Sequence, residues 1–186
     1  MFNGKMTLPP LLISFDGDVR WEEFDSVDFE SVGLFLSCHL LIEHYLDAYL
    51  VSGSTSHFDW RGAGLTFGQK VSLLSGDGKF KEPYTIPASL KHFNSIRNKL
   101  SHNVNFKLTL EVLLPEIQFV NKVDKNKIFE NQNVGIVLQL FTSVVCAFLA
   151  GAITKNLKAQ DVSSGGSYES WSSQVASLSL RTKEDK

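Results

Sequence analysis

The chain has little cysteine, and what it has forms no motif. Cys38 and Cys146 are its two cysteines, and both lie inside apolar runs, where cysteine is usually a small buried hydrophobic side chain. The sequence also contains no glycine-rich phosphate loop, no nucleophile elbow and no paired-cysteine metal site. These absences argue against a nucleotide hydrolase, a serine hydrolase and a zinc finger. Unpaired cysteines also fit a reducing cytosol.

The chain also lacks a strong net charge and an evident secretory signal. Its formal net charge of -2 argues against a protein that coats nucleic acid electrostatically, so any such contact should be local. Near the N-terminus, Pro9 and Pro10 interrupt a short apolar run, and the acidic Asp16 and Asp18 follow at once. We therefore expect a cytoplasmic protein.

One long run contains no charged residue. It extends from Val134 to Ile153, which is the length of a membrane span. However, Gln139 and Thr142 interrupt it with polar groups, and its flanks carry no aromatic belt. A helix in the centre of a bundle, or at a dimer interface, is apolar all round for the same reason. We favour such a helix and expect no membrane contact.

The rest of the sequence predicts an all-α protein. With 43% hydrophobic residues and 5 prolines among 186 residues, most of the chain should fold, and as one domain. Helical spacing of apolar residues predicts helices over residues 29–51, 65–75, about 87–102, 109–123 and 134 to about 157. Ser26 or Asp28 can cap the first of these helices. The expected organisation is an irregular or weakly extended arm (1–25), a helical domain (26–158) and a flexible tail rich in serine and glycine (159–186).

A basic segment stands out in this faintly acidic chain. Between Pro83 and Leu110 there is no aspartate or glutamate, and the charged residues are Lys91, Arg97, Lys99 and Lys107. A local excess of positive charge suggests a partner that carries phosphate.

Arg97, Asn98 and His102 are the candidate catalytic residues within this segment. On a helix, Asn98 and His102 lie on one face, and Arg97 lies one residue round on a long stem, so the three polar groups can converge. Arginine offers a planar fork that matches phosphate oxygens, and histidine can transfer a proton near neutral pH. Such a set suits metal-free cleavage of a phosphodiester. The alternative is that Arg97 and His102 only neutralise the helix dipole.

The pattern Arg-Asn-x-x-x-His at residues 97–102 resembles the signature of the HEPN superfamily. Residues 41–43, 65–70 and 90–103 also look like the mannitol-repressor-like and DUF4145-type branches, so the resemblance covers about residues 29–123. It implies an up-and-down bundle of four to five helices that forms a homodimer, in which two copies of the motif face each other.

The resemblance also implies an activity. Catalytic members cut RNA without a metal or another cofactor, and leave a 2′,3′-cyclic phosphate and a 5′-hydroxyl. By this resemblance His102 is the general acid or base, Arg97 stabilises charge on the phosphate, and Asn98 orients the substrate or the partner histidine. Such proteins often act as toxins or in defence against phage, so an antitoxin or regulatory protein partner is implied. Other members only bind protein or nucleic acid, and a non-catalytic regulator is therefore the alternative.

Four further residues complete the predicted site. We expect Lys91, Lys99 and Asn103 to contact RNA beside the motif. Glu43 on the first helix is expected to face Arg97, where it would pair with Arg97 or tune His102, and an exposed glutamate is the equal alternative. His39 and Glu43 are one turn apart, a spacing that can ligate a metal, but a metal site would need a third ligand. We therefore expect no metal.

Overall fold

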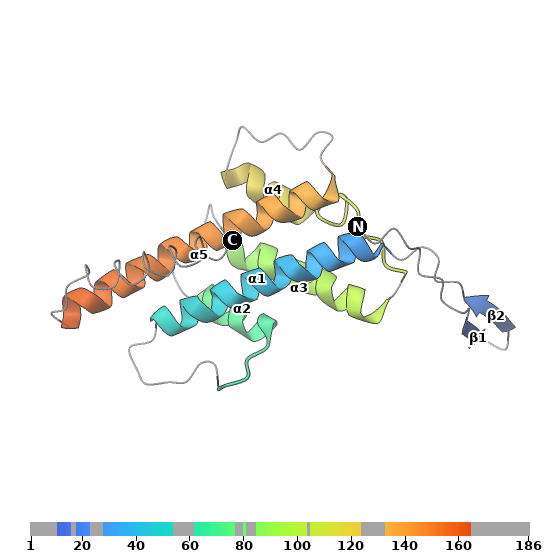
Figure 1. The fold of residues 1–186 in the computed structure, drawn as a ribbon, viewed down its shortest axis with the longest axis horizontal. Helices are drawn as coiled ribbons and strands as arrows, with labels where there is room; N and C mark the ends of the chain where they lie inside the picture. The colour runs from blue at the N-terminus through green and yellow to red at the C-terminus, as the bar shows by residue number, and fades with distance from the viewer. Residues whose placement is uncertain are drawn as a thin grey trace, which may run out of the picture.

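The computed structural model describes residues 11–15, 18–22, 28–53, 62–76, 80, 85–103, 105–123 and 133–164. Within this part of the chain there are two strands and five helices (Figure 1). They are β1 (Leu11–Phe15), β2 (Asp18–Glu22), α1 (Phe29–Gly53), α2 (Phe67–Gly76), α3 (Ile86–His102), α4 (Leu114–Val123) and α5 (Val134–Ser164). The helices form a bundle, which confirms the all-α fold class.

The long helices α1 and α5 lie side by side and run in the same direction (Figure 1). Near their N-terminal ends, a Cβ atom added to Gly135 would lie 3.2 Å from Cδ2 of Leu34. Near the other end, the Nδ2 group of Asn156 donates a hydrogen bond to Oγ of Ser52, at 3.1 Å. Contacts of this kind, at both ends of the two helices, make this pair the central contact of the bundle.

The core is built around aromatic rings from three helices. Phe35 of α1, Phe93 of α3 and Phe141 of α5 are all fully buried. The ring centroids of Phe35 and Phe93 are 4.3 Å apart, and those of Phe93 and Phe141 are 5.1 Å apart. Tilted aromatic pairs at such distances add to the burial of apolar area. Cys38 is buried in the same core and Cys146 is half-buried; both are free thiols.

Two helix starts follow local sequence signals. The backbone N–H of Ser31 donates to Oδ1 of Asp28 at 3.0 Å, so Asp28 caps α1. Hydrogen bonds from the side chain and the backbone of Ser31 lower the pKa of Asp28. At the start of α2, the N–H of Thr66 donates to Oε1 of Gln69, and the N–H of Gln69 donates back to Oγ1 of Thr66. This reciprocal pair is a capping box.

The observed boundaries differ from the expected ones in three places. In the arm, β1 and β2 pair as an antiparallel hairpin from Leu11 opposite Glu22 to Phe15 opposite Asp18. The fourth helix begins at Leu114 rather than near residue 109, and residues 110–113 form turns. Pro115 is the second residue of this helix, in the first turn, where a proline is tolerated. The last helix continues to Ser164, past the expected border at residue 158. There Gln160 donates to the carbonyl of Ser52 at 2.9 Å, a contact made across the bundle. Residues 165–186 of the expected tail lie outside the described part.

Two helices are long and apolar enough to cross a membrane, judged by length and composition. They are Phe29–Gly53 and Val134–Gln160, in which an 18-residue window has a mean hydropathy of 1.2 and 2.3, respectively. Core helices of soluble proteins meet the same criterion. Here the side of α5 that carries Phe141, Val145 and Leu149 is fully buried in the bundle.

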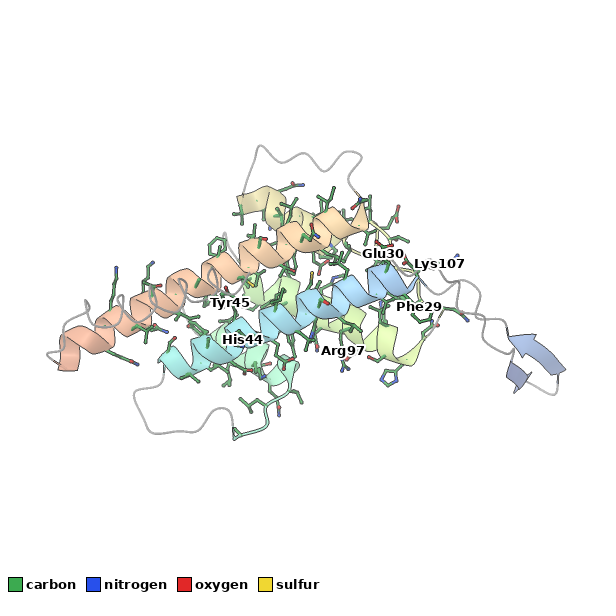
Figure 2. The ribbon with its side chains drawn as sticks, viewed as in Figure 1. Phe29, Glu30, His44, Tyr45, Arg97 and Lys107 are labelled. Atoms are coloured by element: carbon green, nitrogen blue, oxygen red, sulfur yellow. The ribbon has the colours of Figure 1, made fainter. Side chains whose placement is uncertain are left out.

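Part of α1 has an apolar surface that the bundle leaves uncovered. We call Phe29, Leu36 and Leu40 the α1 apolar face, because these large side chains are exposed on one side of the helix; Leu40 is 65% exposed. Figure 2 shows Arg97 between Phe29 and His44 along the length of α1 in that view. Leu36 and Leu40 each lie three residues before a residue that lines the pocket of Arg97, namely His39 and Glu43, so they lie beside it on α1.

Candidate functional site

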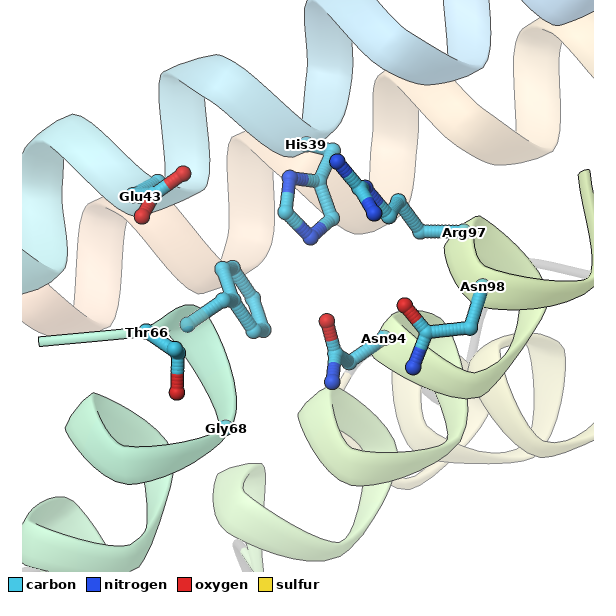
Figure 3. A pocket seen from close by; sticks show the side chains of 8 residues that line it. His39, Glu43, Thr66, Gly68, Asn94, Arg97 and Asn98 are labelled. Carbon is cyan, nitrogen blue, oxygen red and sulfur yellow. The ribbon is translucent and has the colours of Figure 1, made fainter. Parts of the chain in front are cut away.

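A pocket of about 480 Å³ opens between α1, α2 and α3 (Figure 3). Residues from all three helices, or from the turn before α2, line it: His39, Glu43, Thr66, Phe67, Gly68, Asn94, Arg97 and Asn98. Figure 3 shows Glu43 at one end, Arg97 and Asn98 at the other, and His39 between them. Polar side chains thus converge on a pocket that also has an aromatic wall, as ligand sites usually do.

His39 is the most unusual residue of this pocket. It is only 6% exposed, and its ring centroid lies 4.1 Å from that of Phe67 and 6.1 Å from that of Phe93. Among the described residues, its Nε2 atom has no hydrogen-bond partner. Asn94 is close enough to raise the pKa of His39, but burial outweighs that effect and lowers the pKa below its ordinary value. The lowered pKa favours the neutral form of the ring.

Glu43 is held by a buried lysine rather than by Arg97. Nζ of Lys70 lies 2.8 Å from Oε1 of Glu43 and 2.8 Å from Oδ1 of Asp47. Glu43 and Arg97 line the same pocket, but the carboxylate of Glu43 pairs with Lys70 instead of making the expected pair with Arg97. Lys70 was not among the predicted site residues. It could have been noticed as a charged residue in the buried stripe of α2.

Arg97 and Asn98 are exposed at the mouth of the pocket. Arg97 forms no ion pair within the described parts of the chain. The carbonyl of Lys99 near the end of α3 accepts the backbone N–H of Asn103 at 2.9 Å. Because Arg97 has no ion-pair partner among the described residues, its guanidinium is available for a ligand.

The predicted catalytic histidine, His102, lies outside this pocket. His102 is the last residue of α3, is exposed, and is not among the residues that line the pocket. Four residues of helix place it about 6 Å beyond Asn98 along the helix axis. Within one copy of the chain, the structure brings His39, and not His102, together with Arg97 and Asn98 in one pocket.

The predicted RNA contacts lie on the outside of α3. Lys91, Lys99 and Asn103 are all exposed, and none lines the pocket. Nζ of Lys99 lies 5.8 Å from the ring centroid of Phe106, and the side chain of Asn103 accepts the backbone N–H of Asn105. These residues extend a polar surface along α3, away from His39.

A second buried polar pair lies between α3 and α4. Glu116 is fully buried, and its Oε1 lies 2.9 Å from Nδ1 of His92. Burial raises the pKa of Glu116, and the interaction with His92 offsets this only in part. Within the described ranges, no group of three or more histidine, cysteine or acidic side chains is arranged to hold a metal ion.

Comparison with known proteins found no matching family model, no similar curated protein and no similar solved structure. What the site can do has therefore to be judged from its own chemistry.

Proposed function

We propose that this protein is a metal-independent endoribonuclease of HEPN type, whose active site is completed by a second copy of the chain. The observation that supports this most is that Arg97, Asn98 and His102 are all exposed near the end of α3, and that Arg97 forms no ion pair with a described residue. Polar groups presented in this way can act on a substrate instead of stabilising the fold.

The proposed reaction is a transesterification within the RNA. A base removes the proton of a 2′-hydroxyl, the oxygen attacks the adjacent phosphorus, and the bond to the 5′-oxygen breaks as that oxygen receives a proton. The products are a 2′,3′-cyclic phosphate and a 5′-hydroxyl. His102 carries the proton, the guanidinium of Arg97 stabilises the extra charge on the phosphate, and Asn98 orients the reacting groups.

A second copy would supply the second histidine that such a mechanism uses. The α1 apolar face supports this arrangement, because exposed apolar patches mark interaction surfaces and Leu36 and Leu40 lie one turn from pocket residues of the same helix. The homodimer, the cytoplasmic location and a restraining antitoxin or regulatory partner are parts of the same proposal.

The test is an RNA cleavage assay in EDTA with the wild type, Arg97→Ala and His102→Ala. Loss of a proton carrier of this kind should lower the rate by about 100-fold to 10,000-fold. Lys155→Ala, which removes an exposed cation of α5, is the matched control and should cut like the wild type. If a broad RNA panel remains intact, or if both variants cut normally, the protein is not a ribonuclease of this type.

The second candidate is a non-catalytic module that binds RNA or protein through the same helix. The placement of His102 outside the pocket of Arg97 and Asn98 favours it, because a proton carrier must reach the reacting phosphate. This candidate predicts RNA binding that Lys91→Ala and Lys99→Ala weaken, with no cleavage product from the wild type.

A further inference from the structure

We propose that a small pocket between the start of α3 and α4 binds a phosphate group, either as free orthophosphate or on a phosphate monoester. The pocket has a volume of about 180 Å³. Ser89, which lines it, lies eight residues before Arg97 on α3, which is about 12 Å along the helix axis. Among the described residues, none lines both this pocket and the pocket of Arg97. The inference goes beyond the proposed ribonuclease, because it requires neither RNA nor a second copy of the chain.

Ser89 places a buried hydroxyl at the wall of this pocket. The residue is 6% exposed, and no hydrogen bond engages its hydroxyl within the described ranges. Elsewhere on the same helix, the hydroxyls of Ser95 and Ser101 each donate to a backbone carbonyl of the preceding turn. Most buried polar groups in proteins have a partner, because leaving one without a hydrogen bond is costly. The hydroxyl of Ser89 is therefore free to bond a ligand that enters the pocket.

The start of α3 adds hydrogen-bond donors and a favourable electrostatic field. Thr85 is the N-cap residue of α3 and also lines the pocket, yet its side chain makes no capping hydrogen bond. The N–H groups in the first turn of a helix have no partner inside the helix, and they carry partial positive charge. Pro87 has no N–H, which leaves those of Ile86 and Ala88, and the first turn contains no acidic residue. An anion in the pocket would lie at this positive end of α3.

The opposite wall, on α4, carries a full positive charge. Lys122 is exposed, lines the pocket and forms no ion pair with a described residue. Gln118 lies one turn before it on the same face, and its carboxamide can donate as well. No carboxylate is among the described lining residues; Glu116 of the same helix is fully buried and bonds His92 instead. The pocket therefore combines a cation and several donors without an opposing negative charge.

These groups match a phosphate better than a carboxylate. The donors belong to two helices, so they approach the pocket from two sides. A carboxylate presents two oxygens in one plane, whereas a phosphate presents oxygens in several directions and carries about two negative charges near neutral pH. Pro115 and Phe119 form an apolar part of the wall, against which the organic group of a monoester can pack. Phosphate is therefore the ligand class that uses both walls at once.

The test is an NMR titration of the nitrogen-15-labelled full chain with sodium phosphate, at constant ionic strength and about pH 7.5, above the second pKa of phosphate. The amide signals of Ala88 and Ser89 should shift together, with half-saturation at about 1 mM. Lys122→Met should raise the half-saturation concentration at least about tenfold, and Ser89→Ala about threefold to tenfold. Lys155→Met and Ser95→Ala make the same changes outside the pocket and should bind phosphate as the wild type does.

Glycerol 3-phosphate, titrated in parallel, distinguishes the two sources. If it saturates the site at a lower concentration than orthophosphate, the ligand is a phosphate monoester; if it needs a higher concentration, the ligand is free phosphate. The inference is overturned if orthophosphate shifts neither signal, if sodium acetate at the same ionic strength shifts them equally, or if Lys122→Met and Ser89→Ala both bind normally. A single-stranded RNA without terminal phosphate that displaces orthophosphate would also overturn it, because the site would then be an RNA contact. Since no cleavage is measured, a failed ribonuclease assay leaves this result standing.

Discussion

Replacing Lys70 with methionine should destabilise the bundle and disturb the pocket at once. The side chain of Lys70 is 9% exposed, and its ammonium group lies 2.8 Å from carboxylates of Glu43 and Asp47. Methionine keeps most of the length and apolar contact of lysine but removes the charge. Lys70→Met therefore leaves two carboxylates, one turn apart on α1, without the cation that separates them.

The size of the effect follows from the burial of the three groups. Breaking a fully buried ion pair costs about 3–5 kcal/mol, whereas an exposed pair contributes at most about 1 kcal/mol. The carboxylate side chains of Glu43 and Asp47 are 27% and 37% exposed, so water can solvate them in part after the lysine is lost. We therefore expect a loss of about 2 kcal/mol, which corresponds to a decrease in Tm of about 4–8 °C in a domain of this size.

Urea unfolding followed by circular dichroism would measure this loss. Lys155→Met on the exposed side of α5 is the control and should change stability by no more than about 0.5 kcal/mol. Burial opposes the charge of Lys70, but hydrogen bonds to Asp47 and Glu43 and their charges together raise its pKa. A raised lysine pKa stabilises the fold below the ordinary value of 10.5, and this contribution is lost as the pH rises through the folded-state pKa. A variant as stable as the wild type at pH 7 would refute this reasoning.

Three other perturbations test the fold and the proposed dimer. Because burial raises the pKa of Glu116, the free energy of unfolding should fall as the pH rises from 4.5 through the folded-state pKa, and Glu116→Gln should remove this fall. Urea unfolding between about pH 4 and pH 8 would measure it. If wild type and variant show the same dependence of unfolding free energy on pH, the reasoning is wrong. Leu40→Glu should shift a dimer toward monomer in mass photometry with the fold intact; an unchanged mass would exclude Leu40 from the interface. Phe93→Ala should cost about 3–5 kcal/mol of unfolding free energy, and a loss below about 1 kcal/mol would contradict its central place in the core.

The helices could be predicted because their signals are local. Asp28 caps the first helix as its sequence position indicates, and the five predicted helices all occur in the described residues. The end of the last helix was harder to predict. Gln160 belongs to a polar stretch that resembles the tail, and its bond to the carbonyl of Ser52 comes from a helix more than a hundred residues away in the chain. A contact of that range leaves no periodic trace in the sequence.

The sequence by itself determined that this protein is helical, that it carries a basic segment, and that Arg97, Asn98 and His102 lie close together on one helix. These properties depend on spacing along a single helix, which has a fixed geometry. Only the tertiary structure decided that His39 shares a pocket with Arg97 and that Glu43 pairs with Lys70. Such partners depend on how α1, α2 and α3 are rotated and packed against one another, and that packing is set by the whole core.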